Sequence, residues 1–350
     1  MKHTNMFRTL AQIPVVVFIL VIIGCTSSTN KNPTSDSATM ISLSTTANDN
    51  PLPSWNEGDV KKGLLDFVSN AAKEGGSGFI PVADRIAVFD NDGTLWSEQP
   101  LYFQFFYSFD KIRQMAPQHP EWKTREPFKS VLEGNIKGAL ASGEKGLMAI
   151  MAATFGGMSG DEFDKSVKEW ADTAMNPVKK KKYVDMIFQP MVELLQYLRA
   201  NGFQTFIVSG GDITFMRVWA EKAYGIPPQQ VVGSSFKVSY DSTGIKRLPQ
   251  FEFMDDAAGK PVGIYQHIGK KPVFAAGNSD GDYQMLQWTS TNSLPHMEII
   301  VHHTDSTREW SYDRGSPIGK LEKGLDDAPK YGWVLVDMKS DWKKVYPSDQ

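Results

Sequence analysis

The sequence has a single cysteine, Cys25, among its 350 residues. One cysteine cannot form a disulfide within the chain, so a fold held together by disulfides is excluded. The six histidines show no spacing typical of metal ligands. The chain must therefore depend on a hydrophobic core. With 41% hydrophobic residues, it is long enough for one large domain or a core domain with a smaller one.

A basic excess is also lacking, because 37 Lys and Arg residues stand against 40 Asp and Glu residues. Nucleic-acid binding requires a broad basic surface that contacts phosphates, so we expect no nucleic-acid partner. The one dense basic run, Lys179 to Lys182, precedes a helical pattern. We interpret this run as a solvated face and not as a binding patch.

The apolar run from Ile13 to Ile23 is too short to span a membrane comfortably and is typical of a secretory signal. Leu20 to Cys25 resembles a bacterial lipobox, which predicts a lipoprotein-type signal peptide over residues 1–25, with Cys25 lipidated. An ordinary signal with an incidental cysteine is the alternative. The sequence thus predicts an exported protein, periplasmic or anchored to the outer membrane, that meets the membrane only through an N-terminal lipid anchor.

Residues 26–53 are rich in Ser, Thr, Asn and Pro and have almost no large apolar side chain. Such a segment cannot bury enough surface to fold, so we expect a flexible tether. Folded sequence is expected from Ser54, which can cap a helix whose apolar residues begin at Val60.

From there short apolar runs alternate with amphipathic helical patterns, including one helix over residues 184–200. Continuous apolar strands separated by helices predict an α/β fold: a Rossmannoid, three-layer core with a parallel sheet covered on both faces. The expected strands are Ile86–Phe89, Phe206–Val208, Val273–Ala276, Glu298–Val301 and Trp333–Val336.

Two segments interrupt this alternation. Residues 101–182 are too long for a loop and have helical stretches of their own, so we expect a helical cap inserted into a core domain of residues 54–100 and 183–350. Residues 236–240 alternate in polarity and precede a turn signal at 241–244, which predicts a small hairpin.

Polar clusters follow three of the expected strands: Asp90 to Thr94, Ser209 to Gly211, and Gly277 to Asp282. Ligands bind beyond the carboxyl ends of the strands in an open parallel sheet. Three such clusters at three strand ends are difficult to explain by packing alone. We therefore expect them to form one site.

Asp90 and Asp92 repel each other unless a cation lies nearby, and oxygen ligands suit Mg²⁺. Asp90 can attack phosphorus to form an aspartyl-phosphate, and Asp92 can act as the acid and base. Ser209, with Gly210 and amides at a following helix N-terminus, can hold phosphate oxygens. Asn278, with Asp280 and Asp282 as further oxygen donors, can hold the metal or its waters. A lysine must offset this negative charge, and the candidates are Lys260, Lys270 and Lys271.

These clusters resemble three motifs of the haloacid-dehalogenase superfamily, in the family's order, and the arrangement is similar to the phosphoserine-phosphatase-like branch. The resemblance implies that Asp90 is the nucleophile and a metal ligand. It implies that Asp92 is the acid/base and ligates Mg²⁺ through its carbonyl, while Ser209 binds phosphate. Lys260 fits the motif lysine best, because residues 261–268 can form the expected helix after it. Asn278 departs from the family pattern, which usually has Asp there, and Asp282 aligns with the second acid.

Glu98 follows the first motif, where related phosphatases place substrate-recognising groups on a mobile segment. It can therefore hold a substrate amine, although a solvated acid is an equal alternative. The aromatic run from Tyr102 to Phe109 is either a cage for a cationic group or the core of the cap. His302 and His303 directly follow a strand and can approach the site.

The sequence thus predicts Mg²⁺-dependent hydrolysis of a small phosphate monoester through Asp90. A carboxylate at position 92, which family dehalogenases lack, favours phosphate esters as substrates. A phosphotransferase or phosphonate hydrolase on the same fold is an alternative. A non-catalytic, surface-anchored binding lipoprotein is another, but such a protein has no need of a nucleophile beside an acid.

Overall fold

The computed structural model describes residues 50–349, so the expected signal peptide, Cys25 and most of the expected tether lie outside the described residues. Leu52 falls within the expected tether, yet it is fully buried. The folded part therefore begins before Ser54. Among the described residues, no helix is long and apolar enough to cross a membrane.

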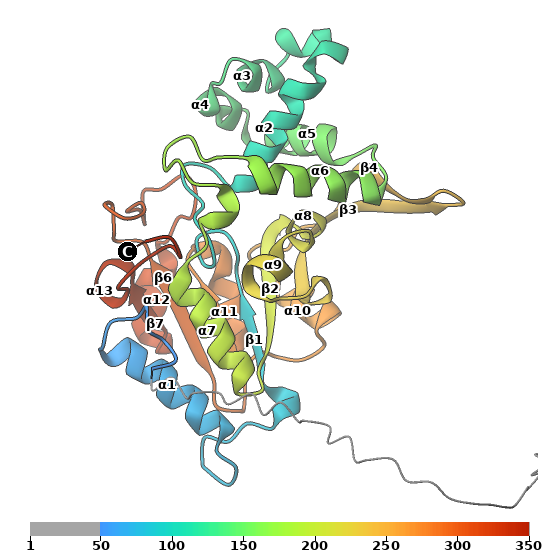
Figure 1. Ribbon diagram of the computed structural model, residues 1–350. Helices are drawn as coiled ribbons and strands as arrows, with labels where there is room; N and C mark the ends of the chain where they lie inside the picture. Colours follow the sequence, from blue (N-terminus) through green and yellow to red (C-terminus); the bar gives the residue numbers. More distant parts are fainter. Residues whose placement is uncertain (1–49, 350) are drawn as a thin grey trace, which may run out of the picture. The chain divides into compact units, whose positions relative to one another are not determined.

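Seven strands form one sheet in the order β4-β3-β2-β1-β5-β6-β7 (Figure 1). All neighbours pair in parallel except β3 and β4, which are antiparallel. This confirms the α/β fold with a parallel sheet. The strands are β1 Ile86–Phe89, β2 Gln204–Asp212, β3 Val231–Asp241, β4 Gly244–Phe253, β5 Phe274–Gly277, β6 Met297–His302 and β7 Val334–Asp337.

The sheet is covered on both faces because successive side chains of each strand point to opposite sides. Ala87 and Phe89 belong to a core shared with α1 (Asp59–Ala72) and α7 (Gln189–Ala200). Ile86 and Val88 belong to the opposite core, shared with the other helices. The helices on that face are α10 Gly259–His267, α11 Tyr283–Thr289 and α12 Lys323–Tyr331.

Five of the α-helices between β1 and β2 lie within residues 101–182, the segment expected to form a cap, and α7 follows them. They bury the aromatic run, so Phe103, Tyr107 and Phe109 are core residues and not a ligand cage. The helices are α2 Phe103–Met115, α3 Phe128–Leu132, α4 Ile136–Ala141, α5 Gly143–Phe155 and α6 Gly160–Thr173.

The hairpin of β3 and β4 is longer than expected and packs on α5 and α6 (Figure 1). Arg247 of β4 donates from its backbone N–H to the Met158 carbonyl, while its Nε donates to the Phe155 carbonyl. The Arg247 guanidinium lies 4.0 Å from the centre of the Phe163 ring. The hairpin therefore joins the sheet to the inserted helices.

Two helix starts differ from expectation. The helix expected over 184–200 begins at Gln189, because Pro190 fits the first turn of a helix but disfavours helical geometry before it. Ser54 does not cap α1, which begins at Asp59. Its N–H and hydroxyl instead donate to the buried Glu193 carboxylate at 2.8 and 2.6 Å. The short helices α8 Ile213–Arg217, α9 Ala220–Tyr224 and α13 Met338–Asp341 complete the set of α-helices in residues 50–349.

Candidate active site

The three polar clusters meet because β2, β1 and β5 are neighbours in the sheet. The Asp90 N–H donates to the Ala276 carbonyl at 2.9 Å, which extends the parallel register of β1 and β5 by one residue. This places Asp90 beside the start of the loop at Asn278. The expected gathering of Asp90, Ser209 and Asn278 at one edge of the sheet follows from this register.

Lys260, near the start of α10, is the candidate lysine that lies in this cluster. Its Nζ is 2.6 Å from Asp90 Oδ1 and 2.7 Å from Asp282 Oδ1, and it also donates to the Val208 carbonyl at 2.9 Å. The other two candidates lie elsewhere. Lys270 pairs with Asp84 on the surface, and Lys271 bonds to Thr291.

Burial alone would lower the pKa of Lys260, but the carboxylates of Asp282 and Asp90 outweigh that effect and raise it. Lys260 therefore stays protonated. Burial raises the pKa of Asp90 well above its usual value, and the nearby charge of Asp282 raises it further, against the opposing effect of Lys260. One ammonium group is thus not enough to balance the carboxylates around Asp90.

Asp92 is only half-buried, and its Oδ1 accepts a hydrogen bond from Trp96 Nε1 at 2.8 Å. Burial raises the pKa of Asp92 to about 6, although the Trp96 bond opposes the shift. The side chain can therefore exist in both protonation states near neutral pH. A general acid that later becomes a general base needs this property.

The turn after Asp92 depends on Gly93, which has a φ of +77°. A side chain at this position would collide with Asn278 and Glu98, so only glycine fits. Asn278 is fully enclosed: its Nδ2 donates to Glu98 Oε1 at 2.7 Å, and its Oδ1 accepts from the Thr94 hydroxyl at 3.1 Å. The Asn278 side-chain amide is therefore held in one orientation.

Asp282 holds the loop that carries Asn278. Its Oδ2 accepts the backbone N–H groups of Asn278 and Ser279 at 2.9 and 3.0 Å, while its Oδ1 faces Lys260. Asp280 points elsewhere and accepts the Gly324 N–H at 2.8 Å. Of the two acids, Asp282 thus belongs to the cluster, and Asp280 holds the start of α12.

Glu98 is 1% exposed, so it is neither a solvated acid nor part of an exposed segment. Burial raises its pKa well above the usual value. Its Oε1 accepts from the Tyr312 hydroxyl at 2.7 Å as well as from Asn278. The Glu98 carboxylate therefore forms part of the wall of the site.

Ser209 is buried and follows Val208, whose carbonyl accepts a hydrogen bond from Lys260. The Ser209 Oγ accepts the Gly211 N–H at 3.1 Å. The helix expected after Ser209 and the two glycines is present, because α8 begins at Ile213. Strand β2 continues to Asp212, which caps α8 by accepting the Phe215 N–H at 2.9 Å. Gly210 remains partly exposed at the open side of the cluster, near the Asp256 side chain.

The sequence reasoning missed the segment after β6, which closes the site from the other side. His303 Nε2 donates to the Gly93 carbonyl at 2.7 Å, and the His303 ring stacks on Tyr312 at 4.3 Å between centres. The adjacent histidines were the only signal in the sequence. His302 instead approaches Asp313. No periodic pattern could have placed Tyr312, because its segment is irregular.

The part of the chain that holds Asp90, Ser209, Lys260 and Asn278 is similar to known proteins. A family model described as haloacid dehalogenase-like hydrolase matches residues 87–287, which is more than half of the chain. None of the curated proteins matches the chain in sequence.

Solved structures are similar at low sequence identity. A conserved functionally unknown protein from Anaerococcus prevotii is 16% identical, with a TM-score of 0.51 over 85% of this chain and 97% of that chain, which supports the fold alone. A phosphoserine phosphohydrolase-like protein from Francisella tularensis is 17% identical, with a TM-score of 0.34 over 62% of this chain and 87% of that chain. The second TM-score is too low to carry an argument. On the strength of the family match, the chain belongs to the haloacid dehalogenase-like hydrolases.

Proposed function

We propose that the protein hydrolyses a small phosphate monoester in two steps through a phosphorylated Asp90. The observation that carries this proposal is the buried contact between Lys260 Nζ and Asp90 Oδ1 at 2.6 Å, with Asp92 two residues away. Lys260 opposes the rise in the pKa of Asp90 and so favours the ionised form, which is the nucleophile. Asp92 supplies a proton donor whose pKa is near 6.

In the first step an Asp90 carboxylate oxygen attacks phosphorus, and the bond from phosphorus to the ester oxygen breaks. Protonated Asp92 gives its proton to that oxygen, so the alcohol leaves neutral. In the second step the Asp92 carboxylate takes a proton from water as the water attacks the phosphorus of the acyl phosphate. Inorganic phosphate leaves, and Asp90 and Asp92 return to their starting states.

The donor set fits Mg²⁺. Asp90, the Asn278 amide oxygen and the backbone carbonyl of Asp92 are hard oxygen donors, and the crowded carboxylates leave an excess of negative charge for a divalent cation to offset. Among the described residues, no group of three or more His, Cys, Asp or Glu side chains forms a metal site. Bound Mg²⁺ would supply charge neutralisation for the phosphate and Asp90.

We also propose that residues 101–182 act as a cap over the substrate, and that export places the enzyme outside the cytoplasm, with Cys25 lipidated. The inserted helices between β1 and β2 support the first proposal, and the apolar run before Cys25 supports the second.

The test is hydrolysis of an aryl phosphate by the purified full chain, with Mg²⁺ and with a chelator, by the wild type and by Asp90→Asn. We expect turnover only with Mg²⁺, and a loss of at least about 10³-fold in Asp90→Asn, since the nucleophile is removed. An acyl phosphate trapped on the wild type and absent from the variant would identify the intermediate. Equal turnover by both proteins would exclude Asp90 as the nucleophile, and added alcohols that accept the phosphoryl group would point to a phosphotransferase.

A further inference from the structure

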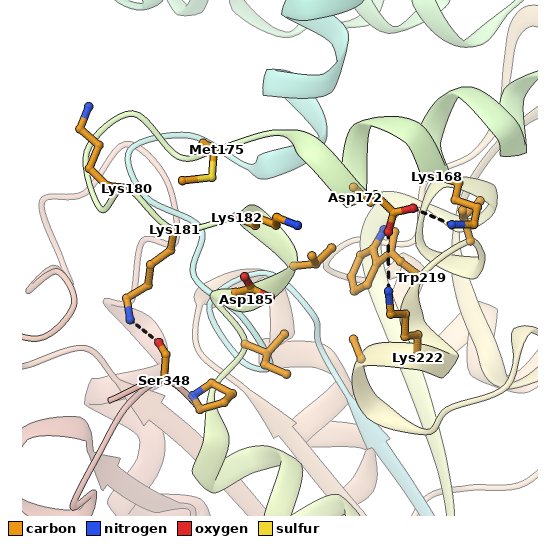
Figure 2. A pocket seen from close by; sticks show the side chains of 16 residues that line it. Lys168, Asp172, Met175, Lys180, Lys181, Lys182, Asp185, Trp219, Lys222 and Ser348 are labelled. Carbon is orange, nitrogen blue, oxygen red and sulfur yellow. Dashed lines mark hydrogen bonds and ion pairs between the residues drawn. The ribbon is translucent and has the colours of Figure 1, made fainter. Parts of the chain in front are cut away.

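A cavity of about 720 Å³ lies outside the candidate active site. It is bounded by the end of α6, by the loop of residues 175–182 and the segment after it, by α9, and by Pro347 and Ser348 near the end of the chain (Figure 2). None of the residues assigned to the candidate active site lines it. A volume of several hundred Å³ is typical of small-molecule sites.

The lining of this cavity combines an apolar floor with a basic rim. Val184, Ile187, Val218 and Trp219 contribute apolar surface. Five lysines and two aspartates also line it, which gives the lining a formal charge of +3 on a chain of net charge −3. The lysines are Lys168, Lys180, Lys181, Lys182 and Lys222. An anion with an apolar body matches both features.

Three of the five lysines have partners. Lys168 and Lys222 lie 2.6 and 3.6 Å from the Asp172 carboxylate, and Lys181 lies 3.1 Å from Asp349 (Figure 2 shows the pairs with Asp172). Within residues 50–349, no ion pair joins Lys180 or Lys182 to a carboxylate. Figure 2 shows Lys182 among the side chains that line the cavity, whereas Lys180 points away from them, so the Lys182 ammonium group is the one available to a ligand there.

The loop that carries Lys180 and Lys182 has a fixed shape. The Asn176 Oδ1 accepts the N–H groups of Val178 and Lys179, both at 2.9 Å, and Met175 forms an antiparallel bridge with Lys182. Donors held in place before binding lose less entropy when a ligand arrives. Lys180 and Lys182 are exposed, as expected of a solvated face, whereas Lys179 and Lys181 are half-buried. Lys179 bonds to the Glu309 carbonyl at 2.8 Å, and the other three lysines line the cavity.

The two sites are neighbours that share no lining residue. Trp219 stacks on Trp96 with 4.2 Å between ring centres, and Trp96 in turn donates to Asp92. The Trp96 ring therefore lies between Asp92 and Trp219, the residue that lines the cavity.

We propose that this cavity binds a small amphipathic anion, whose charged group pairs with Lys182 and whose apolar part lies on Val184, Ile187 and Trp219. The site is independent of hydrolysis at Asp90. Octane-1-sulfonate has both features and no hydrolysable ester. Sulfate carries only the charge, and octanol carries only the apolar chain.

The test is calorimetric titration of the purified full chain with octane-1-sulfonate below its micelle concentration. The test variant is Lys180→Gln/Lys182→Gln. The matched control is Lys123→Gln/Lys137→Gln, which removes two exposed lysines that do not line the cavity. We expect one site per chain and at least tenfold weaker binding in the test variant, since the ion pair with Lys182 is lost. We also expect wild-type affinity in the control, weaker binding at high salt, and at least tenfold weaker binding of sulfate and octanol.

Three results would overturn the proposal. The first is the absence of saturable binding to the wild type. The second is equal binding by the two double variants, or by octanol and octane-1-sulfonate. The third is binding that is lost in Asp90→Asn but kept in Lys180→Gln/Lys182→Gln, because that would place the anion at the candidate active site.

Discussion

The Lys260 ammonium group is in direct contact with two buried carboxylates, those of Asp90 and Asp282. An isolated buried ion pair is a weak source of stability, because desolvation offsets the Coulomb attraction. Its removal is costly nonetheless, since the carboxylates would remain buried without a partner. Lys260 is thus needed both for the fold of the site and for the charge state of the nucleophile.

Lys260→Met should therefore reduce both stability and activity. We expect a loss of about 3–5 kcal/mol in the free energy of unfolding, measured by urea denaturation, and at least about a 10²-fold lower kcat/KM for an aryl phosphate. Lys270→Met is the matched control, because Lys270 pairs with Asp84 on the surface and such pairs contribute about 0–1 kcal/mol. If both variants behaved alike, the assignment of the motif lysine to Lys260 would be wrong.

Asn278 and Glu98 form a hydrogen-bonded pair in the candidate active site. Asn278 stands where the family usually has Asp, which removes one negative charge from the expected ligand set. The Glu98 carboxylate lies 2.7 Å from the Asn278 amide nitrogen, so a carboxylate is still present beside position 278. An Asp at position 278 would face Glu98 with like charge, so the amide is the residue that this neighbour tolerates.

At the scale of elements, the core strands were predictable because each is a continuous apolar run between turn signals. The five expected strands are β1, β2, β5, β6 and β7. Their carboxyl ends carry the polar clusters, so most of the site was also predictable. The full β3–β4 hairpin was not, because most of its outer half is exposed and its polar residues give little periodic signal. His303 approaches the site as its position after a strand suggested, but Tyr312 was missed because it lies in an irregular segment.

Arg247 connects three elements, and its replacement tests whether the hairpin holds the inserted helices in place. Its Nη2 donates to the buried Asp212 carboxylate at 2.9 Å, next to the start of α8. Burial raises the pKa of Asp212, and Arg247 opposes that shift. Arg247→Met should lower the free energy of unfolding by about 3–5 kcal/mol, since it leaves a buried charge without a partner.

The control for Arg247 is Lys246→Met, because Lys246 pairs with Asp241 on the exposed part of the same hairpin. We expect that change to cost less than about 1 kcal/mol. Asp212→Asn added to Arg247→Met should restore part of the stability by removing the unpaired charge. No recovery in the double variant would mean that the lost packing on Phe163, and not the ion pair, accounts for the effect.

At the scale of the whole molecule, several carboxyl groups are buried with raised pKa values in the absence of metal. Burial raises the pKa of Asp92 to about 6 and those of Asp255 and Glu298 to about 7. A raised carboxyl pKa means that the folded state binds the proton more tightly than the unfolded state does. The stabilising effect is present at low pH and is lost as the pH rises through the folded-state value.

The metal-free chain should therefore become less stable between about pH 5 and pH 7.5, with a fall of at least about 5 °C in Tm measured by calorimetry. Asp255→Asn should flatten this dependence and raise Tm at pH 7.5, because it removes a buried charge that is not a metal ligand. Mg²⁺ should raise Tm more at pH 7.5 than at pH 5, since protons compete with it for Asp90. A metal-free Tm that rises across this range would show that the buried carboxyl groups are not the dominant titrating groups. A Mg²⁺ effect that is independent of pH would place the metal away from Asp90.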